Sequence, residues 1–397
     1  MDIHSPSQSI VSYMSKDIRK ESHVVKERIN WIDQGRGFLM FYLVIIELFP
    51  EALLGNDPIT AFFFTHPSPK TAPWMNTYDL GVPAFFFIIG LLYSVSFLSR
   101  MRREGTGKAV LHAILRWGSI YAAGIIIILL TRTAGLGEVK EIVPGVEMFV
   151  VSWDVVDSIG FVGLLCIPFM FLSRKMRLIA SYSLMSFYQV MLFIPGTYWR
   201  EYALGSVHGG ILGGIFVLIP IVLIGSYVGE YYIVGKTMSR ADKNKKLVVF
   251  AVINLAIGLM LWMIPGGYPN KRMSTMSWAV ISLAVIMFGM RVFVWADYKT
   301  EEYPNLNLVN KVRISLFKAY GMNPALMYAL ATLLSLFTET LSVELQLAVW
   351  AILVPIISIV AYTLSRRDTA ISTTKVVLIL IIILAVLAVI LRSINFF

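Results

Sequence analysis

Residues 211–229 read ILGGIFVLIPIVLIGSYVG, a stretch of nineteen residues that contains no charged side chain. A helix of this length extends about 28 Å, close to the roughly 30 Å thickness of the hydrocarbon core of a bilayer. In hydrocarbon the backbone must satisfy its own hydrogen bonds, and a helix does so within a single segment. The stretch therefore predicts a transmembrane helix.

Similar apolar segments recur along all 397 residues. We predict spans at residues 36–54, 80–99, 110–131, 156–173, 178–195, 211–233, 248–265, 278–295, 323–341, 347–364 and 376–393. Charged residues make up only 15% of the chain, whereas a soluble domain has about 25% to cover its surface. The sequence therefore predicts an all-α, polytopic transmembrane helix bundle of about 11 helices, with little extramembrane structure.

The chain divides into a short polar tail and one apolar domain. Residues 1–30 are polar and basic, with neither an apolar core nor a small-residue cleavage site. We therefore expect an N-terminal tail at 1–30, rather than a cleaved signal, and a single transmembrane domain at 31–397. No internal repeat is evident, in contrast to the repeated halves of many transporters. With one cysteine, Cys166, there is no disulfide framework.

Positive charge is distributed unevenly between the two sides of the predicted bundle. Of 34 Lys and Arg residues, twenty-four lie in the tail and in alternate loops, and six lie in the opposite loops. This bias predicts an integral membrane protein with a cytoplasmic N-terminus, and we expect a prokaryotic plasma membrane. The net charge of +10 then reflects topology and contact with anionic membrane lipids. Without a compact basic domain, nucleic acid is not an expected partner.

The first predicted helix carries three ionisable residues, which are costly in a membrane and mark either a function or a partner. Asp33 and Arg36 are three residues apart, so they share a helix face and favour a structural ion pair at the cytoplasmic end. Glu47 lies fourteen residues beyond Asp33, about 21 Å along the same helix. It is therefore a candidate for a site near the extracytoplasmic end.

His66 and Asp79 flank the outer loop FFFTHPSPKTAPWMNTYDLGVPAFFF. A single loop histidine is usually only solvated, and an interface belt explains aromatic residues such as Trp74 and Tyr78. Such a short aromatic loop is nevertheless expected to fold onto the bundle. A histidine beside a carboxylate is an arrangement that supports proton transfer. We predict His66 and Asp79 as catalytic residues.

Basic residues cluster on the predicted cytoplasmic side of the second and third spans. His112 and Arg116 are one helical turn apart and follow Arg102, Arg103 and Lys108. Together these residues could bind phosphate groups. The alternative is that they extend to lipid headgroups, which explains most of the cluster equally well.

Four sequence blocks carry a resemblance to a known family. They are RINWIDQGRGFLMFYLVIIE at 28–47, THPSPKTAPWMNTYDLGVPAFFFIIG at 65–90, YPNKRMSTMSW at 268–278 and KAYGMNPALMYAL at 318–330. The matching positions are Asp33, Arg36, Gly37, His66, Asp79, Leu80, Pro83, Phe85, Phe87, Gly90, Asn270, Lys271, Gly321, Met322 and Asn323. In this order, the blocks resemble the heparan-alpha-glucosaminide N-acetyltransferase family of transmembrane acyltransferases. The chain departs from the family at Glu47, where the family often has asparagine, and span 376–393 has no match.

The resemblance implies acetyl transfer from cytosolic acetyl-CoA, the donor substrate, to an amino or hydroxyl group of a sugar or glycan outside. His66 would be the general base or would itself be acetylated, and Asp79 would fix its tautomer. The oxyanion and substrate would be contacted by Glu47, Asn270, Lys271 and Asn323. The cations around Arg116 would hold the donor's phosphates. No metal is expected, and a homodimer is compatible with this interpretation.

Two alternatives remain open. A secondary transporter would use buried acids for proton or ion coupling, namely Asp33, Glu47, Asp79, Glu230 and Glu339. The missing repeats and the four blocks count against it. A different membrane acyltransferase, acting on a lipid or polysaccharide, fits the helix count and the basic cytoplasmic face as well.

Overall fold

The computed structural model describes residues 29–50, 72–133, 155–195, 197–234, 238–302, 315–338 and 341–367, together with a few residues at 53, 62–63 and between 369 and 386. Within these residues the structure is helical and contains no strand. The α-helices are α2 (Asn30–Glu47), α5 (Gly81–Glu104), α6 (Thr106–Thr133), α7 (Val155–Phe169), α8 (Arg174–Phe193), α9 (Tyr198–Gly205), α10 (Gly210–Gly213), α11 (Ile219–Gly229), α12 (Arg240–Trp262), α13 (Met276–Glu302), α15 (Ser315–Met322), α16 (Pro324–Thr338) and α17 (Val343–Arg366). A 3₁₀ turn, η1 (Thr77–Leu80), precedes α5, and π-helical turns flank α11 at η2 (Gly214–Leu218) and η3 (Glu230–Val234).

Six helical segments of the described chain have the length and apolar composition of membrane-spanning helices, and a bent pair formed by α8 and α9 would make seven. They are Thr77–Glu104, Thr106–Ile126, Gly210–Val234, Arg240–Trp262, Met276–Trp295 and Val343–Arg366. The predicted all-α membrane bundle is therefore supported. The number of about eleven spans stays a prediction, because α7 and α16 have only 15 residues each. The predicted span 376–393 lies largely outside the described residues.

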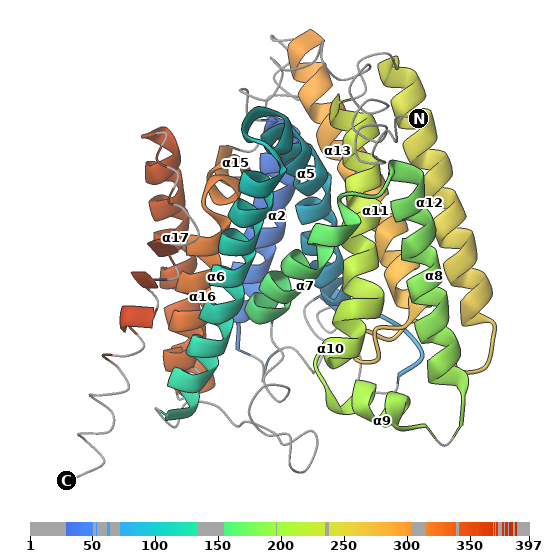
Figure 1. Ribbon diagram of the computed structural model, residues 1–397. Helices are drawn as coiled ribbons and strands as arrows, with labels where there is room; N and C mark the ends of the chain where they lie inside the picture. The colour runs from blue at the N-terminus through green and yellow to red at the C-terminus, as the bar shows by residue number, and fades with distance from the viewer. Residues whose placement is uncertain are drawn as a thin grey trace, which may run out of the picture.

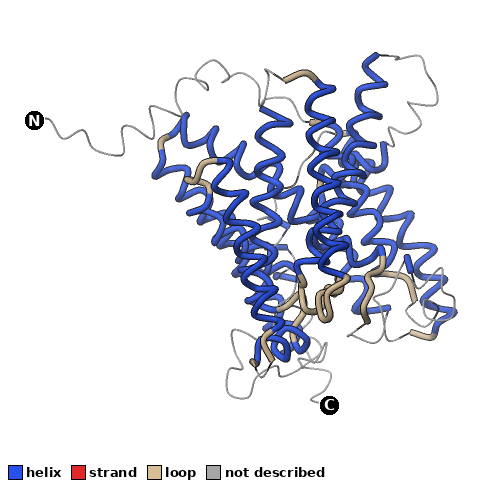
Figure 2. Tube along the Cα trace, turned by 90° about the vertical axis from the view of Figure 1, so that its right-hand side faces the viewer, coloured by secondary structure: helices blue, strands red, loops and turns tan. Residues whose placement is uncertain are grey.

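The bundle has two distinguishable ends (Figure 1). The basic end contains the turn between α5 and α6 and the first residues of α2, α8 and α12. The loop end contains residues 72–80, residues 263–275 and the short helices α9 and α10, and many of its connections appear as tan loops at the bottom of Figure 2. By the Lys/Arg distribution, the basic end is the predicted cytoplasmic end.

Helix α2 begins earlier than the predicted start of the first span. Its first residue is Asn30 rather than residue 36, so Asp33 and Arg36 lie within the helix. This polar first turn is stabilised by α15, because Arg36 Nε donates a 2.9 Å hydrogen bond to the carbonyl oxygen of Gly321.

Glycines set the closest helix contacts. A Cβ atom on Gly37 of α2 would overlap the backbone of Phe317, and one on Gly321 of α15 would overlap the backbone of Asp33. Between α5 and α11, Gly90 and Gly225 allow the same close approach. These small residues let backbones meet where helix association in a membrane depends on packing.

Buried side chains form two apolar cores. The larger joins α5, α6, α7, α8, α11 and α13, with Trp278 and Tyr188 among its largest buried members. The smaller joins α2, α15, α16 and α17 around Met40, Tyr320 and Ile357. Helix α2 therefore lies between the two cores and contacts both α5 and α15 (Figure 1).

Candidate functional site

Asp79 is buried at the loop end, with only 1% of its surface exposed. Its Oδ2 atom accepts a 3.0 Å hydrogen bond from the backbone N–H of Asn76, within a reciprocal capping box that begins η1. Its carbonyl oxygen accepts a 3.2 Å hydrogen bond from the indole of Trp278 on α13. The local turn therefore holds the carboxylate in place.

The loop before α13 packs onto the segment that carries Asp79. The backbone N–H of Asn270 donates a 2.9 Å hydrogen bond to Thr275 Oγ1. The side-chain Oδ1 of Asn270 accepts a 2.9 Å hydrogen bond from the backbone N–H of Met273. Its Nδ2 lies 3.5 Å from the carbonyl oxygen of Ala72. Lys271 places its ammonium 4.9 Å from the centre of the Tyr78 ring. The structure therefore brings the predicted Asn270 and Lys271 to the neighbourhood of Asp79, although they are about 190 residues apart in sequence.

His66 lies outside the described residues. Phe62 and Phe63, which precede it in the sequence, are described, and both contact Thr77 of η1. Thr77 Oγ1 donates to the carbonyl oxygens of Phe62 at 2.9 Å and Phe63 at 3.2 Å, and the hydroxyl of Tyr42 also bonds to the Phe63 carbonyl. The chain therefore meets α2 and η1 three residues before His66.

Two other predicted substrate residues are placed differently. Glu47 is the last residue of α2 and lies half-buried at the loop end, as expected. Asn323 does not join this group. It lies at the basic end, where its Nδ2 donates to the Thr369 carbonyl at 3.0 Å and its Oδ1 accepts from the Ile371 N–H at 2.7 Å. Its amide joins the ends of α15 and α17, because the break between α15 and α16 falls at the basic end.

Sequence reasoning missed a strained pair of loops at the loop end. His208 is 4% exposed and has a left-handed backbone with φ of 51°, and Ser274 has φ of 50°. Gly209, next to His208, donates to the carbonyl oxygen of Arg272 at 2.7 Å, so this loop meets the one that carries Lys271. Strained non-glycine residues cluster at functional sites. The signal in the sequence is the His-Gly-Gly run at 208–210.

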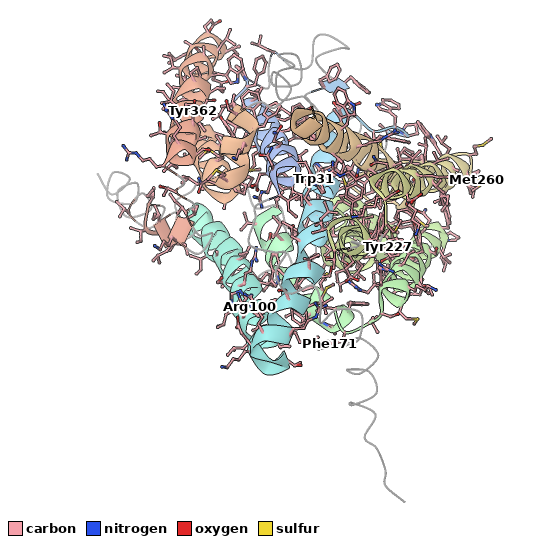
Figure 3. The ribbon with its side chains drawn as sticks, turned by 90° about the horizontal axis from the view of Figure 1, so that it is seen from above. Trp31, Arg100, Phe171, Tyr227, Met260 and Tyr362 are labelled. Atoms are coloured by element: carbon pink, nitrogen blue, oxygen red, sulfur yellow. The ribbon has the colours of Figure 1, made fainter. Side chains whose placement is uncertain are left out.

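At the basic end, the predicted ion pair between Asp33 and Arg36 is present. Lys108, His112 and Arg116 follow one another at four-residue spacing and therefore share a face of α6. Arg102 and Arg103 are exposed in the last turn of α5. The guanidinium of Arg116 lies 4.9 Å from the centre of the Trp117 ring. Figure 3 views the bundle from above and marks the same region by Arg100.

Arg36 and Arg116 line a common cavity of about 230 Å³, which we call the arginine cavity. It lies between α2, α5, α6, α7 and α16 and extends to Leu43 and Phe85, nearer the loop end. A second cavity of about 310 Å³, the glycine cavity, lies between α2, α5 and α13. It contains Thr77 and Phe63, so it reaches the segment that carries Asp79.

The described residues contain no group of three or more histidine, cysteine, aspartate or glutamate side chains placed to hold a metal ion. Comparison of the chain with protein-family models and with curated proteins gives no match. The sequence resemblance therefore supports a proposal, not an assignment.

Proposed function

We propose that this protein is a transmembrane acetyltransferase that passes an acetyl group from cytosolic acetyl-CoA to an amino or hydroxyl group of a sugar or glycan on the opposite side. The observation that carries the proposal is the meeting of Asp79, Tyr78 and Lys271 at the loop end. Phe63, which is three residues before His66 in the sequence, accepts a hydrogen bond from Thr77 of the same η1 segment. Acyl transfer can use a carboxylate and a cation together with a general base, which is the role predicted for His66.

In the proposed reaction, the acceptor nitrogen attacks the thioester carbonyl carbon of acetyl-CoA. The C–N bond forms, the C–S bond breaks, and coenzyme A leaves as its thiol. His66 accepts the proton that the acceptor amine must lose and then donates a proton to the departing sulfur. Lys271 stabilises the negative charge that develops on the carbonyl oxygen. Asp79, which the capping box holds at the start of η1, orients the imidazole of His66 and fixes its tautomer.

The donor fits the arginine cavity better than the glycine cavity. The pantetheine arm of coenzyme A contains amide groups, which need polar partners inside a bundle. Arg36 is already paired with Asp33, so Arg116 is the cation of this cavity that we assign to the donor's phosphates. Lys108 and His112 extend the same face of α6 toward the basic end, where Arg102 and Arg103 lie nearby.

The transporter alternative is less favoured by the contacts of its candidate acids. Asp33 is paired with Arg36, and Asp79 caps η1. Glu230 is paired with Arg177, which is 2% exposed and also donates to Ser226 Oγ at 2.8 Å. These ion pairs suit a structural role for Asp33 and Glu230. Glu339 lies outside the described residues.

Two measurements on detergent-purified protein test the proposal. Acetyl-CoA at a hundred times its dissociation constant should stabilise the fold by about 2.7 kcal/mol, and coenzyme A without its acetyl group should bind at the same site. Radiolabelled acetyl should appear on a glucosamine acceptor. Absence of both binding and transfer would reject the acetyltransferase and leave the two alternatives, a transporter and a different membrane acyltransferase.

A further inference from the structure

The glycine cavity follows α2 along much of its length. Its lining residues on this helix run from Trp31 to Tyr42, a distance of about 17 Å at 1.5 Å per residue. Trp31 lies near the middle of the bundle when it is viewed from the basic end (Figure 3). Phe38 and Val285, which also line the cavity, are 40% and 42% exposed. The cavity therefore opens sideways between α2 and α13, toward the hydrocarbon of a bilayer.

Each of the three helices around the cavity contributes a glycine to its wall, namely Gly35, Gly81 and Gly289. A Cβ atom on Gly81 or Gly289 would meet no atom within 4 Å, and one on Gly35 would meet only the Phe293 ring, at 3.7 Å. These glycines therefore differ from Gly37 and the other packing glycines, because no helix contact requires them. Glycine also disfavours a helix relative to alanine. Their effect is to keep space open along the cavity.

The walls of the cavity select an apolar occupant. Apart from the hydroxyls of Tyr42 and Thr77, its lining side chains are aliphatic or aromatic, with the indole of Trp31 at the basic end. The two hydroxyls lie together at the loop end, 3.3 Å apart. Amide groups along the middle of the cavity would lose their hydrogen bonds to water without replacement. A hydrocarbon chain incurs no such cost, and its polar head would lie at the end where the hydroxyls are.

That end is continuous with the candidate site. Thr77 lines the cavity and is two residues from Asp79, and the neighbouring Tyr78 contacts Lys271. We propose that the glycine cavity binds the hydrocarbon chain of a lipid-linked acceptor, whose sugar is thereby held beside Asp79 and Lys271. This inference rests on the proposed acetyl transfer and narrows its acceptor to an amphiphile. The acyl donor and its arginine cavity are unaffected.

Two glucosamine glycosides test the inference on the intact, purified protein. One carries a methyl group and the other a hexadecyl chain with a diazirine near its end. The ratio of their kcat/KM values should favour the hexadecyl glycoside by about tenfold or more, because each buried methylene adds binding energy. Ultraviolet irradiation should attach the diazirine to peptides from α2 and α13.

Cavity-filling variants provide the decisive comparison. Gly289→Leu and Gly35→Leu should each reduce both the photolabelling and the kcat/KM ratio by about tenfold. Gly118→Leu is the matched control, since Gly118 is a helical glycine of α6 with no atom within 4 Å of an added Cβ and lines neither cavity. The Gly118→Leu variant should retain both the photolabelling and the kcat/KM ratio of the parent protein.

The outcomes separate the two proposals. Equal kcat/KM values for the two glycosides in the parent protein would overturn the lipid-linked acceptor and leave acetyl transfer standing. Displacement of the photolabel by acetyl-CoA would also overturn it, by assigning the cavity to the donor. Photolabelling that is lost in Gly289→Leu, without transfer to either glycoside, would uphold chain binding and reject acetyl transfer to this acceptor.

Discussion

The ammonium of Lys271 lies 4.9 Å from the centre of the Tyr78 ring, so a cation from the loop before α13 contacts the residue next to Asp79. A cation above an aromatic face is attracted to the ring and is held in position by it. This contact places the cation and the carboxylate at one end of the bundle, where the proposed reaction needs them.

Replacement of Lys271 tests its proposed role as the oxyanion donor. Lys271→Gln should lower kcat by about 10²-fold with a smaller effect on KM, because the interaction forms mainly in the transition state. Lys271→Arg should restore part of the rate, since it keeps the charge. Arg272→Gln is a suitable control on the adjacent residue, whose carbonyl rather than side chain bonds to Gly209. An equal loss of kcat in Lys271→Gln and Arg272→Gln would indicate a general effect on the loop and not a role for the Lys271 charge.

His66→Ala should abolish acetyl transfer, while acetyl-CoA still raises the melting temperature of the variant. A general base contributes about 10²–10⁴-fold to the rate, and a nucleophile contributes more. Asp79→Asn should lower the rate less, because an amide oxygen can still accept the hydrogen bond from the Asn76 N–H, while the proposed orientation of His66 by a carboxylate would be lost. Transfer at the parent rate in His66→Ala would remove His66 from the mechanism.

Arg116→Ala should weaken acetyl-CoA binding by tenfold or more, or about 1.4 kcal/mol for each factor of ten. The affinity for the acceptor should not change, because the proposed acceptor would enter at the loop end. Calorimetric titration of the variant and the parent protein measures the affinity for acetyl-CoA and the affinity for the acceptor. Arg174→Ala is a matched control, since Arg174 also lies at the basic end over an aromatic ring, that of Tyr227, but does not line the arginine cavity. A dissociation constant for acetyl-CoA equal to that of the parent would assign Arg116 to lipid headgroups instead.

The predicted membrane topology can be tested by labelling single cysteines that are introduced into the Cys166→Ser variant. Lys245 is exposed near the start of α12, at the basic end, and Met263 is exposed just after α12, at the loop end. Each is replaced by cysteine in a separate variant, Lys245→Cys or Met263→Cys. A membrane-impermeant maleimide added to intact cells should label position 263 and leave position 245 unlabelled. The reverse pattern would invert the predicted orientation.

Several features could be predicted from sequence because their causes are local. The apolar run at 211–229 lies within a helical segment long enough to span a membrane, as length and hydropathy require. The ion pair between Asp33 and Arg36 follows from their three-residue spacing on one helix. The proposed roles of His66 and Arg116 stay predictions.

Other features depend on how the helices pack. The pairing of Arg177 with Glu230 joins α8 to the end of α11, and Asn323 proved to lie at the basic end rather than near Asp79. The sequence does not distinguish Gly37, which lets two helices touch, from Gly289, which leaves space beside a cavity. The physical reason is that most of these helices are apolar on every face. Hydropathy and spacing therefore determine which segments cross the membrane, whereas only the packed bundle decides which face of each helix meets a neighbour, a cavity or lipid.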